Sequence, residues 1–296
     1  YAKRFFPNTK SVSVFGGEGG SFDTSLGVVS TPEYGKVFIA IESTTGNNLT
    51  ATEKSTLITA LSPFTVASIT PVVVDPQTTN LILNVNFQFD SSKTTETVTS
   101  LASKINTTLT NYNTTNLAQF DGAFRHSKVT GLIDDTDTAI TSNITTVTLA
   151  HNLTPTLNTS KSYTIQLNNK FSNPHTEHNK AAGGILASTG FKVSGDASNV
   201  QFFDDDGAGN IRRYYLVAGV RQYQDNTAGT ITYSTGEIKI NNINITSVEE
   251  VDETASTFIR LTVQPDSLDI VPVRNQILKI DFVNTSIIGA IDTIAT

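Results

Sequence analysis

Residues 81–89 constrain the fold most, because apolar and polar side chains alternate there from residue 83 to residue 89. A β-strand directs successive side chains to opposite faces of its sheet, so this alternation predicts a strand with one buried face and one wet face. The polar face, formed by Asn84, Asn86 and Gln88, is left for water or for another chain. The apolar face consists of Leu81, Leu83, Val85, Phe87 and Phe89.

Helical and strand patterns alternate on both sides of this strand. Thr50 and Glu53 form a capping box that predicts a helix start at residue 51. The elements come in the order strand, helix, strand, strand, helix, helix, strand, which predicts an α+β domain at 31–155 built as a split βαβ, ferredoxin-like sandwich. Its helices are expected at 51–61, 94–112 and 120–133, and its strands at 36–41, 66–74, 81–89 and 138–149.

After Pro155 the patterns are those of strands only, so we expect a β-rich domain at 156–296. Residues 172–189 are predicted to form a long irregular loop. The apolar C-terminal tail, residues 287–294, has two interpretations: it forms an intersubunit contact, or it docks on its own domain. Residues 1–30 are expected to form a strand and a Gly/Ser-rich loop that continue from a missing N-terminal part. The tail residues proposed for an interface are Ile287, Ile288, Ile291 and Ile294, together with Asn84, Asn86 and Gln88.

The composition argues against several classes of partner. A net charge of −7 with 16% charged residues gives an acidic, polar surface without a basic patch, so nucleic acid is not an expected partner. No apolar run approaches the roughly 20 residues that cross a bilayer, so we expect a soluble chain with no membrane partner. The chain begins at Tyr1 and contains no Met, which indicates the trailing part of a longer product.

Motifs for catalysis are missing from the sequence, and we expect no enzyme activity and no cofactor. There is no cysteine, and the four histidines lie in no recognisable catalytic pattern. The segment 204–207, Asp-Asp-Asp-Gly, resembles the start of a calcium loop, but it lacks the distal Glu, and a hairpin turn is the favoured interpretation. His175, Glu177 and His178 are candidate metal ligands, for which a solvated loop is favoured. We therefore expect no metal.

Four motifs in chain order resemble those of a known family. Residues 12–18 (VSVFGGE) and 32–41 (PEYGKVFIAI) are similar to two strands that recur in the baseplate wedge proteins of T-even-type contractile-tail phages, within the Baseplate J family. Residues 69–76 (ITPVVVDP) resemble a third strand, and 120–134, which begins FDGAFRHSKV, resembles a helix of that family. The resemblance covers about residues 12–150.

This resemblance implies the C-terminal part of a structural subunit of the tail baseplate. Family members form part of the ring around the hub by self-association, as homodimers, and by contacts with the long wedge subunit and the sheath-proximal subunits. The ring rearranges when the sheath contracts, and it is assembled in the host cytoplasm before it resides in the virion. The alternatives are a baseplate component of a phage-like contractile injection system and a carbohydrate-binding receptor module, for which Tyr214, Tyr215, Tyr223 and Tyr233 are the candidate stacking residues.

Overall fold

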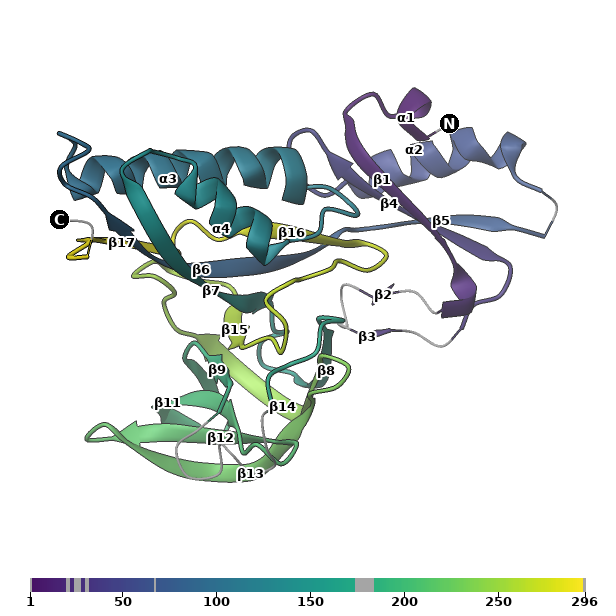
Figure 1. Cartoon of the computed structure of the whole chain (residues 1–296). Helices are drawn as coiled ribbons and strands as arrows, with labels where there is room; N and C mark the ends of the chain where they lie inside the picture. Colours follow the sequence, from purple (N-terminus) through teal and green to yellow (C-terminus); the bar gives the residue numbers. More distant parts are fainter. Residues whose placement is uncertain are drawn as a thin grey trace.

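The computed structural model describes residues 2–19, 22–23, 28–29, 32–66, 68–173 and 184–294. Its strands far outnumber its helices, and the helices lie along the upper side of the view in Figure 1, away from the strands at the bottom. The chain is thus a mixed α+β protein, as predicted. Within the described residues, no helix is both long and apolar enough to cross a bilayer.

The first region is a small sheet of three strands with the order β1-β4-β5. Strand β4 pairs antiparallel with β1 and parallel with β5, and helix α2 packs its Leu57 and Leu61 against Ile39, Ile41 and Val73 of the sheet. The elements of this region are α1 (Ala2–Phe5), β1 (Thr9–Gly16), a 3₁₀ turn (Gly17–Gly19), β2 (Phe22–Asp23), β3 (Val28–Val29), β4 (Lys36–Ser43), α2 (Ala51–Leu61), a 3₁₀ turn (Ser62–Phe64) and β5 (Thr70–Val74).

Helix α2 begins where the sequence predicts. The Thr50 side chain accepts a hydrogen bond from the Glu53 backbone N–H, and the Glu53 carboxylate accepts one from the Thr50 N–H at 2.8 Å. These two bonds satisfy N–H groups that the first turn of a helix leaves without an intrahelical partner. The capping box therefore fixes the start of the helix locally.

The second region is built on the long strand β6 (Gln77–Phe89), which pairs antiparallel with β7 (Ile140–Leu153). Every apolar residue of the predicted inner face is buried, and this face packs under α3 and α4 (Figure 1). The helices of this region are α3 (Val98–Tyr112), its π-helical continuation (Asn113–Leu117) and α4 (His126–Asp134).

The predicted ferredoxin-like sandwich is not confirmed. Strands β4 and β5 belong to the separate three-stranded sheet, whereas β6 and β7 belong to another sheet. The side of β6 opposite β7 is occupied by the C-terminal strands β16 (Gln276–Ile280) and β17 (Ser286–Ile291), both parallel to β6. A split βαβ sandwich would instead unite all four N-terminal strands in one sheet.

The chain between β7 and β16 forms a small barrel joined to the main sheet. The strands β10-β14-β13-β12-β11 are paired in that order, and β11 also pairs with β10, which closes the ring. The connecting strands are β8, which pairs with residues 237–244 of β14 beside the stretch that pairs with β10, and β9 and β15, which lie between β11 and β7. Their bounds are β8 (Ser160–Gln166), β9 (Leu186–Ser188), β10 (Phe191–Val193), β11 (Asp196–Asp205), β12 (Asn210–Val217), β13 (Val220–Thr232), β14 (Glu237–Val248) and β15 (Ile259–Val263).

The predicted extents of two segments, the β-rich region and the long loop, differ from the strands in the structure. The β-rich region was expected to run from 156 to 296, yet β15, β16 and β17 return to the sheet of β6 and β7, because each finds its backbone partners there. The predicted loop at 172–189 contains strand β9, and its residues 174–183 lie outside the described residues together with His175, Glu177 and His178.

Candidate interaction surface

The structure brings the two predicted interface segments side by side. Strand β17 pairs with β6 in a register that sets Ser286 opposite Asn84, Ile288 opposite Asn86 and Ala290 opposite Gln88. Hydrogen bonding adds to this pairing, because the Ser286 hydroxyl donates to the Asn84 side-chain oxygen at 2.8 Å. Of the two interpretations of the tail, its strand thus docks on the chain's own sheet.

The side of the sheet that faces away from the helices is here called the outer face. On it, three cross-strand rows run from β17 over β6 to β7, and the middle row places Asn86 between two exposed isoleucines. Ile144 is 72% exposed and Ile288 is 59% exposed. The outer face consists of Asn84, Asn86, Gln88, Ser142, Ile144, Thr146, Ser286, Ile288 and Ala290.

A shallow groove of about 220 Å³ lies on the outer face between these isoleucines. Its walls are Ile144 and Ile288, and its polar groups are the amides of Asn86 and Gln88 and the Ser142 hydroxyl. Apolar walls around amide groups suit the burial of an apolar side chain beside a hydrogen-bonding group of a protein partner. This is the chemistry of a protein contact, without a charged group.

The other predicted tail residues lie elsewhere. Ile287 is opposite Val85 on the inner face and packs against the main core. Ile291 is opposite Phe89 at the end of the strand and is 53% exposed, and Ile294 follows the strand and is 93% exposed. The proposed interface set is therefore divided between the two faces of the sheet.

Ile144 belongs to the outer face, whereas Val147 and Leu149 of the same strand lie on the inner face. Val147 and Leu149 are buried, whereas Ile144 is exposed. Residues three apart in a strand point to opposite faces, so the spacing of Ile144 and Val147 was the signal that identifies the outer residue. The register shift between Gln88 and Phe89 explains why Ile140, at an even position, is nevertheless buried.

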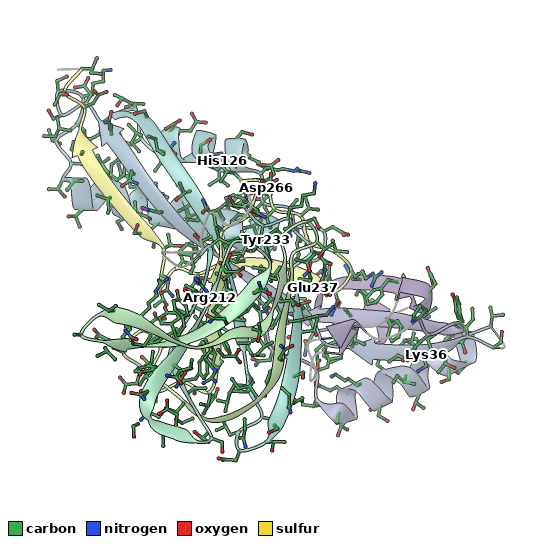
Figure 2. The ribbon with its side chains drawn as sticks, turned by 90° about the horizontal axis from the view of Figure 1, so that it is seen from below. Lys36, His126, Arg212, Tyr233, Glu237 and Asp266 are labelled. Atoms are coloured by element: carbon green, nitrogen blue, oxygen red, sulfur yellow. The ribbon has the colours of Figure 1, made fainter. Side chains whose placement is uncertain are left out.

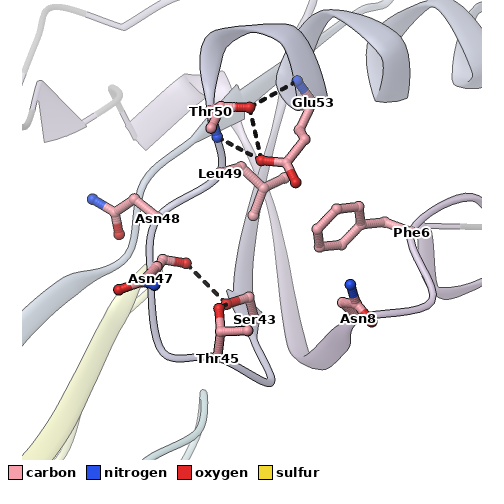
Figure 3. Close-up of a pocket in the computed structure, with 9 residues that line it drawn as sticks. All are labelled: Phe6, Asn8, Ser43, Thr45, Asn47, Asn48, Leu49, Thr50 and Glu53. Carbon is pink, nitrogen blue, oxygen red and sulfur yellow. Dashed lines mark hydrogen bonds between the residues drawn. The ribbon is translucent and has the colours of Figure 1, made fainter.

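A second hollow, of about 230 Å³, lies beside the start of α2 (Figure 3). Phe6 and Leu49 provide its apolar lining, and the remainder is polar. The Ser43 hydroxyl donates to the Asn47 carbonyl at 2.9 Å, and the Glu53 carboxylate is bonded within the capping box. These contacts hold the loop between β4 and α2 in place. The polar lining consists of Asn8, Ser43, Thr45, Asn47, Asn48, Thr50 and Glu53.

The most extensive charged cluster of the described barrel surrounds Asp204 in strand β11. Arg212 donates to its carboxylate through Nε at 2.9 Å and Nη2 at 3.2 Å, Arg221 donates at 3.0 Å, and the Tyr223 hydroxyl donates at 2.8 Å. Burial raises the pKa of the Asp204 carboxyl, against the hydrogen bonds from Arg212 and Tyr223 that lower it. The Arg212 guanidinium also lies 4.3 Å from the centre of the Tyr223 ring.

The neighbouring acidic residues form a turn. Asp205 accepts hydrogen bonds from the Leu186 N–H and from the Tyr233 hydroxyl, and burial together with this second bond raises the pKa of the Tyr233 phenol. Burial opposes ionisation of Asp206, yet hydrogen bonds from Asn210 lower its pKa. Strands β11 and β12 pair on either side, which confirms the hairpin interpretation of 204–207. In the described part of the chain, no group of three or more His, Cys, Asp or Glu residues is placed to hold a metal ion.

The tyrosines considered for sugar stacking are engaged within the barrel. Tyr214 is 8% exposed and lies under the Arg221 guanidinium at 4.8 Å. Tyr223 and Tyr233 donate to Asp204 and Asp205, and Figure 2 shows Tyr233 and Arg212 among the barrel strands. Three of the four candidate rings thus take part in internal contacts, which does not favour a carbohydrate site at these positions.

Comparison with protein families accounts for the first half of the chain. Residues 1–74, which contain the three-stranded sheet, match the model described as baseplate structural protein gp6, C-terminal domain I. Residues 79–152, which contain α3, α4 and nearly all of β6 and β7, match baseplate structural protein gp6, C-terminal domain III. A search of curated proteins gave no match.

The two matched domains follow each other in one chain and together span half of its 296 residues. The protein is accordingly a structural component of a phage tail baseplate. More particularly, it belongs to the family of baseplate structural protein gp6, of which it carries the C-terminal domains I and III. Its place is the tail baseplate of the virion, among other baseplate components.

Proposed function

We propose that this chain is a non-enzymatic subunit of a baseplate wedge, within the wider Baseplate J family. It forms part of the ring around the tail hub by self-association and by contacts with the long wedge subunit and the sheath-proximal subunits, and it rearranges when the sheath contracts. Assembly takes place in the host cytoplasm. The observation that carries this proposal is the succession of two gp6 C-terminal domains at residues 1–74 and 79–152.

The outer face is the surface that we assign to another baseplate subunit. It combines two largely exposed isoleucines with side-chain amides and hydroxyls around a groove, and it carries no charged side chain. Exposed apolar residues rimmed by polar ones are typical of protein contacts. A wedge subunit must hold several neighbours at once, so it needs surfaces of this kind in addition to any self-contact.

The test is co-expression of the chain with the other structural proteins of the same baseplate, followed by light scattering on the purified complexes. Ile144→Lys places a charge in the middle of the outer face and is expected to weaken the complex about tenfold or more. Val283→Lys is the matched control, because Val283 is equally exposed, at 77%, but lies outside the outer face.

Either of two outcomes contradicts the proposal. A chain that remains monomeric and binds none of the baseplate proteins is not a ring-forming subunit. If Ile144→Lys and Val283→Lys weaken the complex equally, the outer face is not the contact surface, although the role as a wedge subunit stands.

A further inference from the structure

The turn between β12 and β13 exposes apolar side chains at the end of a hairpin. Val217 and Val220 are direct cross-strand partners, so the turn itself has two residues, and Figure 1 shows it projecting from the barrel. Leu216 is 48% exposed, Val217 50% and Val220 61%. Residues 216–220, here called the hairpin tip, therefore present five consecutive residues without a polar side chain.

The other turns between neighbouring strands of the barrel carry polar side chains. The turn from β10 to β11 contains Ser194, the turn from β11 to β12 contains Asp206, and the turn from β13 to β14 contains Ser234. Polar side chains are usual in turns because they hydrogen-bond to the nearby backbone and to water. Exposed apolar residues gathered at one place are instead typical of a contact surface.

The backbone of the turn shows that an apolar residue occupies a position suited to a polar one. Ala218 has a φ of +49° and Gly219 a φ of +81°, the left-handed conformations that a two-residue hairpin turn of this kind requires. Asn or Asp is favoured at the first of these positions, because either adopts the left-handed conformation more readily than Ala does. Ala218 thus keeps the hairpin tip apolar against the local backbone preference.

Interactions between side chains fix the strands directly behind the hairpin tip. Arg221, which pairs with Leu216, donates to Asp204 at 3.0 Å and lies 4.8 Å from the centre of the Tyr214 ring. The Tyr214 ring in turn stacks on Phe202 of β11, with 5.6 Å between the ring centres. The hairpin tip is therefore held on a rigid base, and little conformational freedom remains to be lost when it binds.

The hairpin is basic in a chain that is otherwise acidic. Residues 207–224 contain three arginines and no acidic residue, and taking these three charges away from the net charge of −7 leaves −10 on the rest of the chain. The Asp204 carboxylate, which binds two of the arginines, offsets one positive charge. The base of the hairpin tip is thus complementary to an acidic surface. The three arginines are Arg212, Arg213 and Arg221.

The features of the hairpin favour a protein partner over a lipid surface. The chain lies among other baseplate components, and the barrel is outside both matched family domains, the second of which ends at residue 152. Segments that anchor at a membrane surface usually carry Trp or Tyr, whereas the hairpin tip has no aromatic ring. A narrow, convex tip of branched apolar side chains fits a concave apolar pocket.

We propose that the hairpin tip inserts into an apolar pocket, bordered by carboxylates, on a different protein of the baseplate. This inference rests on the proposed function and adds a contact on the barrel that is separate from the outer face. The occupant is a pocket because the tip is convex and apolar, and its border is acidic because the base of the tip is positive.

The experiment locates the partner by crosslinking and then measures the contact. A photo-crosslinking amino acid replaces Val217 in the full chain within assembled baseplates, and mass spectrometry identifies the crosslinked peptide. The dissociation constant is then measured between the full chain and each of the other structural proteins of the same baseplate. Circular dichroism shows that the variants keep the fold, as expected for substitutions at exposed positions.

Two substitutions at Val220 form a matched pair, because they place opposite charges at one exposed position. Both remove the apolar contact and are expected to raise the dissociation constant of the crosslinked protein. Val220→Glu is expected to raise it about tenfold more than Val220→Lys, since a glutamate meets carboxylates of like charge. Val283→Lys, which is equally remote from the hairpin tip and the outer face, is expected to bind like the wild type.

The outcomes separate the contact of the hairpin tip from the broader function. A crosslink to a peptide of another baseplate protein that contains Asp or Glu, with the expected order of the Val220 variants, supports the proposal. The proposal is overturned by a crosslink to a second copy of this chain, by the absence of a crosslink, or by equal losses in the two Val220 variants. Binding to phosphatidylglycerol vesicles that Val220→Glu abolishes, without a protein crosslink, would make the hairpin tip a membrane contact instead. The role as a baseplate subunit is tested independently by Ile144→Lys.

Discussion

Replacing Asp204 by Ala tests whether the barrel depends on its buried charge cluster. The Asp204 side chain is 2% exposed, and the Arg212 side chain that it binds through two nitrogens is 7% exposed. The substitution leaves a buried guanidinium without its carboxylate and deprives Arg221 and the Tyr223 hydroxyl of an acceptor. The substitution therefore acts mainly by stranding positive charge in the barrel wall.

The expected loss of stability depends on the contacts that Arg212 retains in the variant. Breaking a buried ion pair by removing one partner costs about 3–5 kcal/mol. Arg212 still donates to the Asp205 carbonyl at 2.9 Å and still lies over the Tyr223 ring, so we expect the lower end, about 3 kcal/mol. Arg221→Met is the control: its side chain is 36% exposed, and solvent-screened pairs contribute only about 0–1 kcal/mol.

The assay is urea unfolding followed by circular dichroism, with hydrogen exchange of the β12 and β13 amides to report on the barrel alone. A double substitution, Asp204→Leu with Arg212→Met, removes both charges and should cost less than the sum of the separate changes by about 2 kcal/mol. The reasoning is refuted if Asp204→Ala costs no more than Arg221→Met, or if the two effects at Asp204 and Arg212 simply add.

Two further predictions concern the main sheet. Gly289→Val should lower the free energy of unfolding by about 1–3 kcal/mol in urea titrations, because a side chain there would collide with Phe87 and with Val98, whose Cγ2 lies 2.6 Å from the Cβ position. Gly131→Ala is the control, because a Cβ at residue 131 meets open space. A comparable loss of stability in Gly131→Ala would contradict the argument. Burial lowers the pKa of His151 from 6.5 to about 4, and its Nδ1 is buried. Since the pKa of His151 in the folded chain lies below that in the unfolded chain, protonation favours unfolding, and the free energy of unfolding should fall by at most about 3 kcal/mol as the pH drops from 6.5 to 4. His151→Gln should flatten this pH dependence. A variant with the same pH profile as the wild type would contradict the role of His151.

Local signals in the sequence predicted the elements of the first half well. The capping box at Thr50 places the start of α2, and the alternation in 81–89 identifies both faces of β6, because each depends only on neighbouring residues. The resemblance of the motifs at 12–134 to baseplate proteins also agrees with the matched family domains. Periodicity shows which face of an element is buried, and the face of β6 that the sequence predicts to be buried is buried in the structure.

The neighbours of β6 could not be predicted in the same way. Ser286 bonds to Asn84 across 202 positions of sequence, and nothing in either segment specifies that partner over another strand. For the same reason the sequence suggested one sandwich for 31–155, whereas β6 draws its parallel neighbours from the C-terminal end. The candidate surface was predicted as two separate sets, and only the pairing of β17 with β6 unites Asn86 with Ile288.

The attachment of the barrel bears on how a baseplate subunit could transmit movement. The chain leaves the main sheet after Leu153 and returns at Ile259, and these two residues are direct partners in the β7–β15 pair. Strand β9 then joins the two parts, since Ala187 is opposite Thr262 of β15 and also opposite Asp204 of β11. The barrel is thus connected to β6 through consecutive paired strands rather than through a linker. Within the residues that the structure describes, the first sheet shares no strand pairing with β6, and Glu42 of β4 contacts the neighbouring strand β16 through Lys279, 3.0 Å away. Because a hydrogen-bonded ladder resists relative displacement more than side-chain packing does, we expect a displacement of the barrel to reach β6 and the outer face through these strands, whereas the first sheet is joined to β6 by the short connection from Val74 to Gln77.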